Sequence, residues 1–120
     1  MMTLVKGLPE NVVGVAAHGQ VTAHDYENVL IPAVEAALGR HDKVRVYYQI
    51  GADFAGFDLG AAFADLRIGL GRLMHWERIA VVTDIGWIRD AFKVTSFLIP
   101  AQVRIFETAQ AEDAKAWIAA

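Results

Sequence analysis

Hydrophobic and polar positions follow two different periods along this chain, and the changes between them divide it into strands and helices. Runs of apolar, β-branched and aromatic residues predict strands at residues 3–6, 12–18, 44–50, 79–83 and 103–106. Apolar residues spaced three and four apart predict helices at residues 22–38, from 59 onward, at 88–99 and at 111–118. The predicted order of elements is therefore ββαβαβαβα.

The connections between these elements predict how the strands pair. Only a short turn around Pro9 separates the first two strands, so they should form an antiparallel hairpin. Each later strand follows a helix, and such connections place neighbouring strands parallel through right-handed crossovers. We therefore predict an α/β fold with a mostly parallel sheet and an N-terminal antiparallel hairpin, built as a single domain of residues 1–120.

The first helix has the clearest boundaries. Thr22 is a candidate N-cap, and Asp25 completes an aspartate form of the capping box. Gly39 is expected to follow the last turn as the C′ residue. Pro32 lies inside the helical pattern, where it removes one backbone hydrogen bond and should bend the helix, at a cost of up to ~3 kcal/mol.

Composition and charge narrow the possible functions. Hydrophobic residues make up 55% of the chain, above the ~45–50% usual for soluble domains. Buried parallel strands account for such an excess, and so does apolar surface kept for a partner subunit, an apolar ligand or a membrane. The formal net charge is −3 with no basic run, which disfavours nucleic-acid binding. The chain has no cysteine, which excludes thiolate chemistry and Cys-type zinc sites.

The sequence lacks the patterns of a transmembrane helix, a signal peptide and a histidine metal site, which bears on the location and the cofactors of the protein. No apolar run approaches the ~20 residues that a transmembrane helix needs, and the segment MMTLVKGLPEN lacks the apolar core of a signal peptide. We therefore expect a cytoplasmic protein that can also associate with a membrane surface. None of the four histidines forms an H-x-x-x-H pair, so we predict neither a metal site nor a cofactor.

A family resemblance is carried mainly by the central block of the chain. The residues concerned are Tyr47-Tyr48, Asp53-Phe54-Ala55-Gly56-Phe57-Asp58-Leu59-Gly60, Ala64-Asp65-Leu66, His75 to Asp84, Trp87 and Ala116-Trp117-Ile118. With these residues and the predicted order of elements, the chain resembles the bacterial SpoIIAA-like family, which is grouped with STAS and CRAL-TRIO lipid-binding domains. The resemblance implies a STAS-like (SpoIIAA-like) fold over nearly the whole chain.

One feature associated with STAS domains is missing. Anti-sigma-factor antagonists of the STAS type carry a phosphorylatable serine near a helix N-terminus, in a D-S-S-G-like motif. Here Leu59 stands where that serine would be, and Ser96 is the only serine of the chain. The phosphorylation switch is therefore not carried over with the fold. Since no nucleophile, metal cluster or phosphate-binding loop is visible either, we predict that the chain is not an enzyme.

Candidate ligand-binding residues follow the predicted carboxyl ends of the strands, where open α/β folds usually bind ligands. They are Asp53, Phe54, Phe57, Asp58, Phe63, Asp84 and Trp87. A purely structural interpretation makes Asp58 and Asp84 helix caps, Asp53 an Asx-turn and the aromatic residues part of the core. The functional interpretation is an aromatic loop that gates an apolar pocket or dips into a membrane surface.

Two functions remain open from the sequence. The first is a non-enzymatic STAS-like module that binds a small apolar or lipid-like ligand, with peripheral membrane contact. Its pocket would lie between the second and third predicted helices and the sheet. The second is a protein-interaction regulator related to anti-sigma-factor antagonists but lacking the phosphorylatable serine. The apolar surplus fits self-association as a homodimer under either function.

Overall fold

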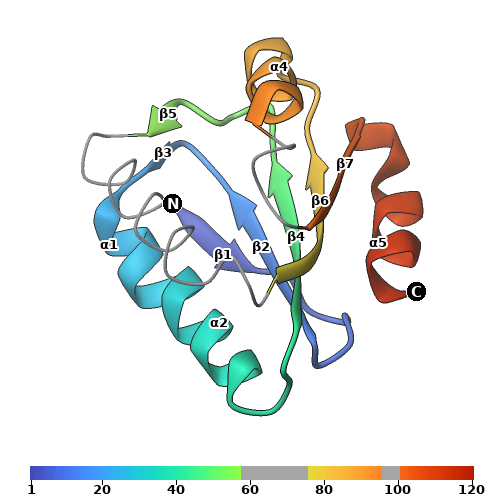
Figure 1. Ribbon diagram of the computed structural model, residues 1–120. Helices are drawn as coiled ribbons and strands as arrows, with labels where there is room; N and C mark the ends of the chain where they lie inside the picture. Colours follow the sequence, from blue (N-terminus) through green and yellow to red (C-terminus); the bar gives the residue numbers. More distant parts are fainter. Residues whose placement is uncertain (58–75, 96–100) are drawn as a thin grey trace.

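The fold was obtained as a computed structural model, which describes residues 1–57, 76–95 and 101–120 (Figure 1). Five strands form the main sheet in the order β1-β2-β4-β6-β7. Their bounds are β1 (Met2–Leu4), β2 (Val12–Ala17), β4 (Val44–Ile50), β6 (Trp76–Val82) and β7 (Gln102–Phe106). β1 pairs antiparallel with β2, and the other neighbours pair in parallel. The predicted α/β fold with its N-terminal antiparallel pair is therefore confirmed.

Helices cover both faces of this sheet (Figure 1). They are α1 (Ala23–Asp25), the π-helical turn η1 (Tyr26–Leu30), α2 (Ile31–Leu38), α4 (Gly86–Thr95), the 3-10 turn η4 (Thr108–Gln110) and α5 (Ala111–Ala119). In Figure 1, α1 and α2 lie on one side of the sheet and α5 lies on the other. The helix predicted from residue 59, and the end of the helix predicted over 88–99, lie outside the described residues.

The start of the first helix is confirmed, whereas its middle and end differ from the prediction. Thr22 N donates to Asp25 Oδ2 over 2.9 Å, and Asp25 N donates to Thr22 Oγ1 over 3.3 Å, which completes the predicted capping box. Pro32 is not inside one continuous α-helix, because η1 interrupts the regular bonding immediately before it and leaves Pro32 in the first turn of α2, where proline is tolerated. Gly39 is the C-cap with φ −69°, so it is not the left-handed C′ residue expected.

The hydrophobic core has one part on each face of the sheet. Alternate residues of β4 divide between them, since Tyr48 belongs to the larger cluster and Tyr47 to the smaller one. Val34 of α2 and Ile88 of α4 complete the larger cluster, and Ile118 of α5 completes the smaller one. Both faces of the central strands are therefore buried, which explains their continuous apolar runs.

The order of the parallel strands never reverses. β4, β6 and β7 are each added on the same side of the strand that precedes them in the sheet. Right-handed crossovers that all progress in one direction place their helices on one face, and the larger core cluster lies on the face that α2 and α4 cover. In open α/β sheets a ligand crevice forms where the strand order reverses. This sheet has no such point of reversal.

A second, two-stranded sheet joins two loops at the carboxyl end of the main sheet. It consists of β3 (Gln20–Val21) and β5 (Gly56–Phe57), which pair in parallel with Gln20 opposite Gly56 and Val21 opposite Phe57. The sequence analysis did not predict this pair, because each strand has only two residues and depends on the other loop. It brings the segment that follows β2 beside the segment that follows β4.

Candidate functional site

The loop that follows β4 contains two of the predicted site residues, Asp53 and Phe54, and its backbone is hydrogen-bonded to the loop that follows β2. Gly19 N donates to the Asp53 carbonyl over 3.1 Å, and Ala55 N donates to the Gly19 carbonyl over 2.7 Å. These bonds continue directly into the β3–β5 pair. The gating motion suggested by the sequence would have to break this pairing.

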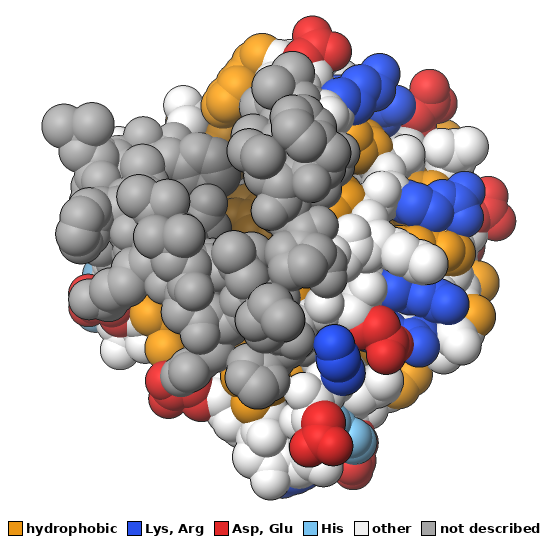
Figure 2. All heavy atoms as spheres, in the orientation of Figure 1, with side chains coloured by type: hydrophobic (Ala, Val, Ile, Leu, Met, Phe, Trp, Pro, Cys, Tyr) orange, Lys and Arg blue, Asp and Glu red, His pale blue; other side chains and the backbone are white. Residues whose placement is uncertain are grey.

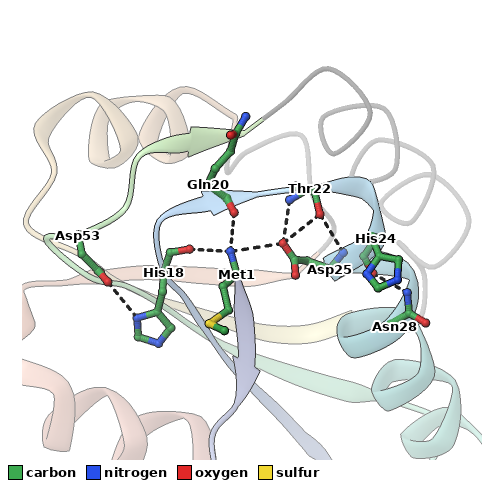
Figure 3. Close-up of polar contacts among 8 residues, drawn as sticks. All are labelled: Met1, His18, Gln20, Thr22, His24, Asp25, Asn28 and Asp53. Carbon is green, nitrogen blue, oxygen red and sulfur yellow. Dashed lines mark hydrogen bonds and ion pairs between the residues drawn. The ribbon is translucent and has the colours of Figure 1, made fainter.

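Asp53 projects from this loop toward His18 (Figure 3). Its Oδ2 lies 3.5 Å from His18 Nδ1, and 64% of the Asp53 side chain is exposed. The carbonyl of His18 also accepts a hydrogen bond from the Met1 ammonium group, which lies 3.4 Å from the Asp25 carboxylate. Asp53 therefore belongs to an exposed polar cluster, and the interaction found for its carboxylate is with His18, in place of the expected Asx-turn.

Phe54 and Trp87 form the aromatic part of the site. Their ring centroids lie 6.4 Å apart with the ring planes tilted by 36°. Phe54 is half-buried and packs against the larger core cluster, whereas Trp87 is 60% exposed. The interpretation of Trp87 as a core aromatic is therefore wrong. Ile88, the next residue of α4, is buried in the core. Trp87 therefore points in a different direction from the helix, and its indole lies at the surface beside Phe54.

Asp84 has a different role from the one predicted. It lies two residues before α4, and its Oδ1 accepts a hydrogen bond from the backbone N–H of Thr108, over 2.9 Å. The hydrogen bonds from Thr108, with a smaller contribution from the Arg89 guanidinium, lower the pKa of the Asp84 carboxyl below its usual value. The structure therefore shows Asp84 fastening the loop after β7, in place of the predicted cap on α4.

The remaining predicted site residues are only partly described. The backbone of Phe57 pairs with Val21 in β5, as stated above. Asp58 and Phe63, together with the expected pocket beside the second predicted helix, lie outside the described residues. The structure thus brings Phe54 and Trp87 together at one end of the sheet and places Asp53 in the loop that carries Phe54.

An open cleft lies at the opposite end of the sheet, where β4, β6 and β7 begin. Its volume is about 540 Å³. It is lined by Lys43, Arg45, Trp76, Glu77, Arg78, Ala101 and Gln102. This cleft was not predicted from the sequence, because ligand-binding residues were expected at the carboxyl ends of the strands. Arg45, Glu77 and Arg78 stand at the starts of strands that are otherwise mostly apolar, and these charged positions could have indicated the cleft from the sequence.

Within the part of the chain that the structure describes, no group of three or more His, Asp or Glu side chains is arranged to hold a metal ion. No helix among these same residues is both long and apolar enough to cross a membrane.

Comparisons with known proteins agree with this architecture. A structural match of TM-score 0.80 is found with the crystal structure of an uncharacterized protein from Shewanella loihica PV-4, of the DUF3478 family with a SpoIIAA-like fold. The two chains share 22% sequence identity, and the match covers 98% of this chain and 93% of that one. No curated protein matches the chain significantly. The model of the SpoIIAA-like family matches residues 12–119, so the chain belongs to the SpoIIAA-like family.

Proposed function

We propose that this chain is a non-enzymatic, STAS-like module that binds a small apolar or lipid-like ligand at the carboxyl end of its sheet and contacts membranes peripherally. The observation that carries the proposal is Trp87, an indole that is 60% exposed and stands beside the half-buried Phe54. A large exposed aromatic side chain costs solvation free energy unless a partner covers it. Indole rings also suit the interface between water and lipid, because they combine an apolar body with one N–H donor.

The chemistry of the chain supports a binding function more than a catalytic one. It has no cysteine and a single serine, Ser96, which is not part of the sequence segment between β4 and the helix predicted from residue 59, where a nucleophile would be expected. Leu59 replaces the phosphorylatable serine implied by the family resemblance. The loop that carries Phe54 is held by backbone bonds to the neighbouring loop, so its aromatic surface is prepared in advance for a ligand.

Native mass spectrometry of the protein purified from its expression host, with organic extraction of the same sample, tests the proposal directly. We expect an added mass that matches an extractable apolar molecule, or uptake when dioleoylphosphatidylcholine is supplied. Flotation with vesicles of the same lipid tests membrane contact. A homogeneous unliganded mass, without uptake and without flotation, would argue against ligand binding and membrane contact together.

A protein-interaction regulator is the second candidate, and the same exposed indole favours it. Tryptophan is enriched among the side chains that dominate protein interfaces. If this function is the correct one, Trp87→Asp will abolish recovery of a protein partner in a pull-down, and no lipid will be bound. We also propose that the protein forms a homodimer in the cytoplasm. Light scattering at several concentrations tests the dimer, and cell fractionation tests the location.

A further inference from the structure

The cleft at the amino ends of β4, β6 and β7 is basic although the chain as a whole is acidic. Its lining contains three basic side chains, Lys43, Arg45 and Arg78, against one acidic side chain, Glu77. The whole chain carries a formal net charge of −3. Figure 2 shows Lys and Arg side chains, with Asp and Glu side chains among them, on the side where β7 and α5 lie. The excess of basic side chains in the lining of the cleft favours an anionic ligand.

The two arginines of the cleft differ in how many of their N–H donors are used by contacts within the described residues. Arg45 Nε donates to Glu77 over 2.6 Å, and its other end donates to the Ile118 carbonyl over 2.9 Å, so its charge is paired. Arg78 donates one hydrogen bond to the Trp117 carbonyl over 2.9 Å and lies 5.3 Å from the centre of the Trp117 ring. No carboxylate pairs with Arg78 among residues 1–57, 76–95 and 101–120.

These contacts of Arg78 prepare it for an anion. The carbonyl and the ring of Trp117 hold the guanidinium in place, so little side-chain entropy remains to be lost on binding. A guanidinium has five N–H donors, and the contact with Trp117 uses one nitrogen only. The Arg78 donors for which the described residues provide no acceptor are suited to the paired oxygens of a phosphate group.

Trp76 supplies a second, independent observation. It lines the same cleft, and its Nε1 is buried without a hydrogen-bond acceptor in the part of the chain that the structure describes. A buried donor without an acceptor costs about 1–3 kcal/mol. An acceptor atom of a bound ligand would remove this cost, and the indole N–H can only donate. Trp76 packs against the larger core cluster and Arg78 against Trp117 of α5, so the two side chains border the cleft from different sides of the sheet.

We propose that this cleft binds the phosphate group of a small phosphorylated molecule. Lys43, Arg45 and Arg78 all line this one cleft, and ammonium and guanidinium groups donate charge-assisted hydrogen bonds to oxyanions. A volume of about 540 Å³ falls within the range of small-molecule sites, ~300–1,000 Å³, so the cleft has room for a molecule larger than the phosphate group itself. The cleft and the Phe54–Trp87 surface lie at opposite ends of the strands, so either proposal can fail without the other.

Titration with inorganic phosphate, followed by the indole N–H signals in two-dimensional ¹H–¹⁵N NMR spectra, tests the site. The chain has three tryptophans, and one Trp→Phe variant for each assigns the three signals. We expect the Trp76 signal to shift and to saturate at millimolar phosphate, while the Trp87 signal stays in place. The affinity should fall as sodium chloride is added, because the attraction is electrostatic. A Trp76 signal that does not move, or that drifts without saturation, overturns the proposal.

A pair of variants with the same change in charge distinguishes a site from general electrostatics. Lys43→Gln removes one positive charge from the cleft, and Lys93→Gln removes one from α4, outside it. We expect Lys43→Gln to weaken phosphate binding about ten-fold or more, as for the loss of one charge-assisted hydrogen bond. Lys93→Gln should change the affinity less than about two-fold, since a distant exposed charge is screened. Equal effects of the two substitutions would overturn the proposal.

The phosphate group can belong to a soluble molecule or to a lipid headgroup, and sedimentation with vesicles separates these sources. Vesicles of phosphatidylcholine with phosphatidic acid are compared with vesicles of phosphatidylcholine alone. Binding that requires phosphatidic acid and weakens in Lys43→Gln assigns a lipid headgroup. Absence of vesicle binding, with phosphate binding retained in solution, assigns a soluble phosphorylated molecule. Trp87→Ala should leave the phosphate affinity unchanged, which keeps this test separate from that of the apolar surface.

Discussion

Replacing Trp87 by alanine should weaken binding to lipid far more than it weakens the fold. An indole side chain presents up to ~250 Å² of surface, and 60% of Trp87 is exposed, which leaves about 150 Å² for a ligand to cover. At ~25 cal/mol per Å² this area corresponds to about 4 kcal/mol if the ligand covers all of it. Coverage of half the area gives about 2 kcal/mol, or a ~30-fold loss of affinity in Trp87→Ala.

Stability should change much less, because the indole has little contact with the core. Within the described part of the chain, the ring contact that the variant removes is the tilted one with Phe54, at 6.4 Å between centroids. Such aromatic pairs contribute about 0.5–1.5 kcal/mol. Urea unfolding followed by circular dichroism should therefore show a small decrease at most in the free energy of unfolding. This combination of results separates a binding residue from a core residue.

Flotation of the protein with phosphatidylcholine vesicles measures the affinity, and the blue shift of tryptophan emission on binding reports whether an indole enters the lipid. Leu4→Ala is the matched control, since Leu4 is 55% exposed but lies on β1, away from Phe54. We expect Leu4→Ala to bind like the unmodified protein. If Trp87→Ala also binds like the unmodified protein, the reasoning from the exposed indole is refuted.

Three further predictions concern the fold. Gly14→Ala places a methyl group 3.0 Å from Val5 Cβ and should lower the free energy of unfolding by about 1–3 kcal/mol. Gly86→Ala is the control, because its methyl group meets no atom within 4 Å, and it should leave the thermal midpoint unchanged or raise it. Equal effects of the two substitutions on stability would contradict this prediction. Thr22→Ala removes the helix cap and should cost about 1 kcal/mol in urea unfolding, and no loss would show that the capping box is not needed. Partial burial raises the pKa of the Asp25 carboxyl. The hydrogen bonds from Thr22 lower this pKa and outweigh the effect of burial, so the pKa lies below its ordinary value. The stabilisation by Asp25 is therefore complete above pH ~4 and is lost as pH falls through the lower folded pKa; Asp25→Asn should flatten this acid dependence, and an unchanged acid limb would contradict it.

The sequence predicted the sheet well because its strands are buried on both faces. The residues of β4 and β6 are mostly apolar because helices cover the central strands on both faces, and this enrichment made the strands visible in the sequence. The beginning of β6 was missed by three residues, because Trp76, Glu77 and Arg78 are half-buried and do not continue the apolar run. The β3–β5 pair was missed because two loops far apart in the sequence stabilise each other there.

The candidate site was predicted less well, because its contacts join distant segments. Asp84 has the sequence pattern of a helix cap, yet the donor that it meets is Thr108, 24 positions later. Local pattern also gave no indication that Trp87 lies at the surface, since Ile88 beside it is buried. The basic cleft combines residues from three strand beginnings, and no short sequence window contains them all.

The uniform direction in which the sheet grows has a consequence for how fast the protein folds. Val13 pairs with Val46, 33 positions later, and Val46 pairs with Ile79, again 33 positions later. Among the strands that the structure describes in the main sheet, only β1 and β2 pair without a helix between them in the sequence. Closing such long loops costs chain entropy before any contact repays it, and rates fall as the mean sequence separation of contacts rises. Refolding in milliseconds to seconds is expected from this topology, well behind helical bundles of the same length.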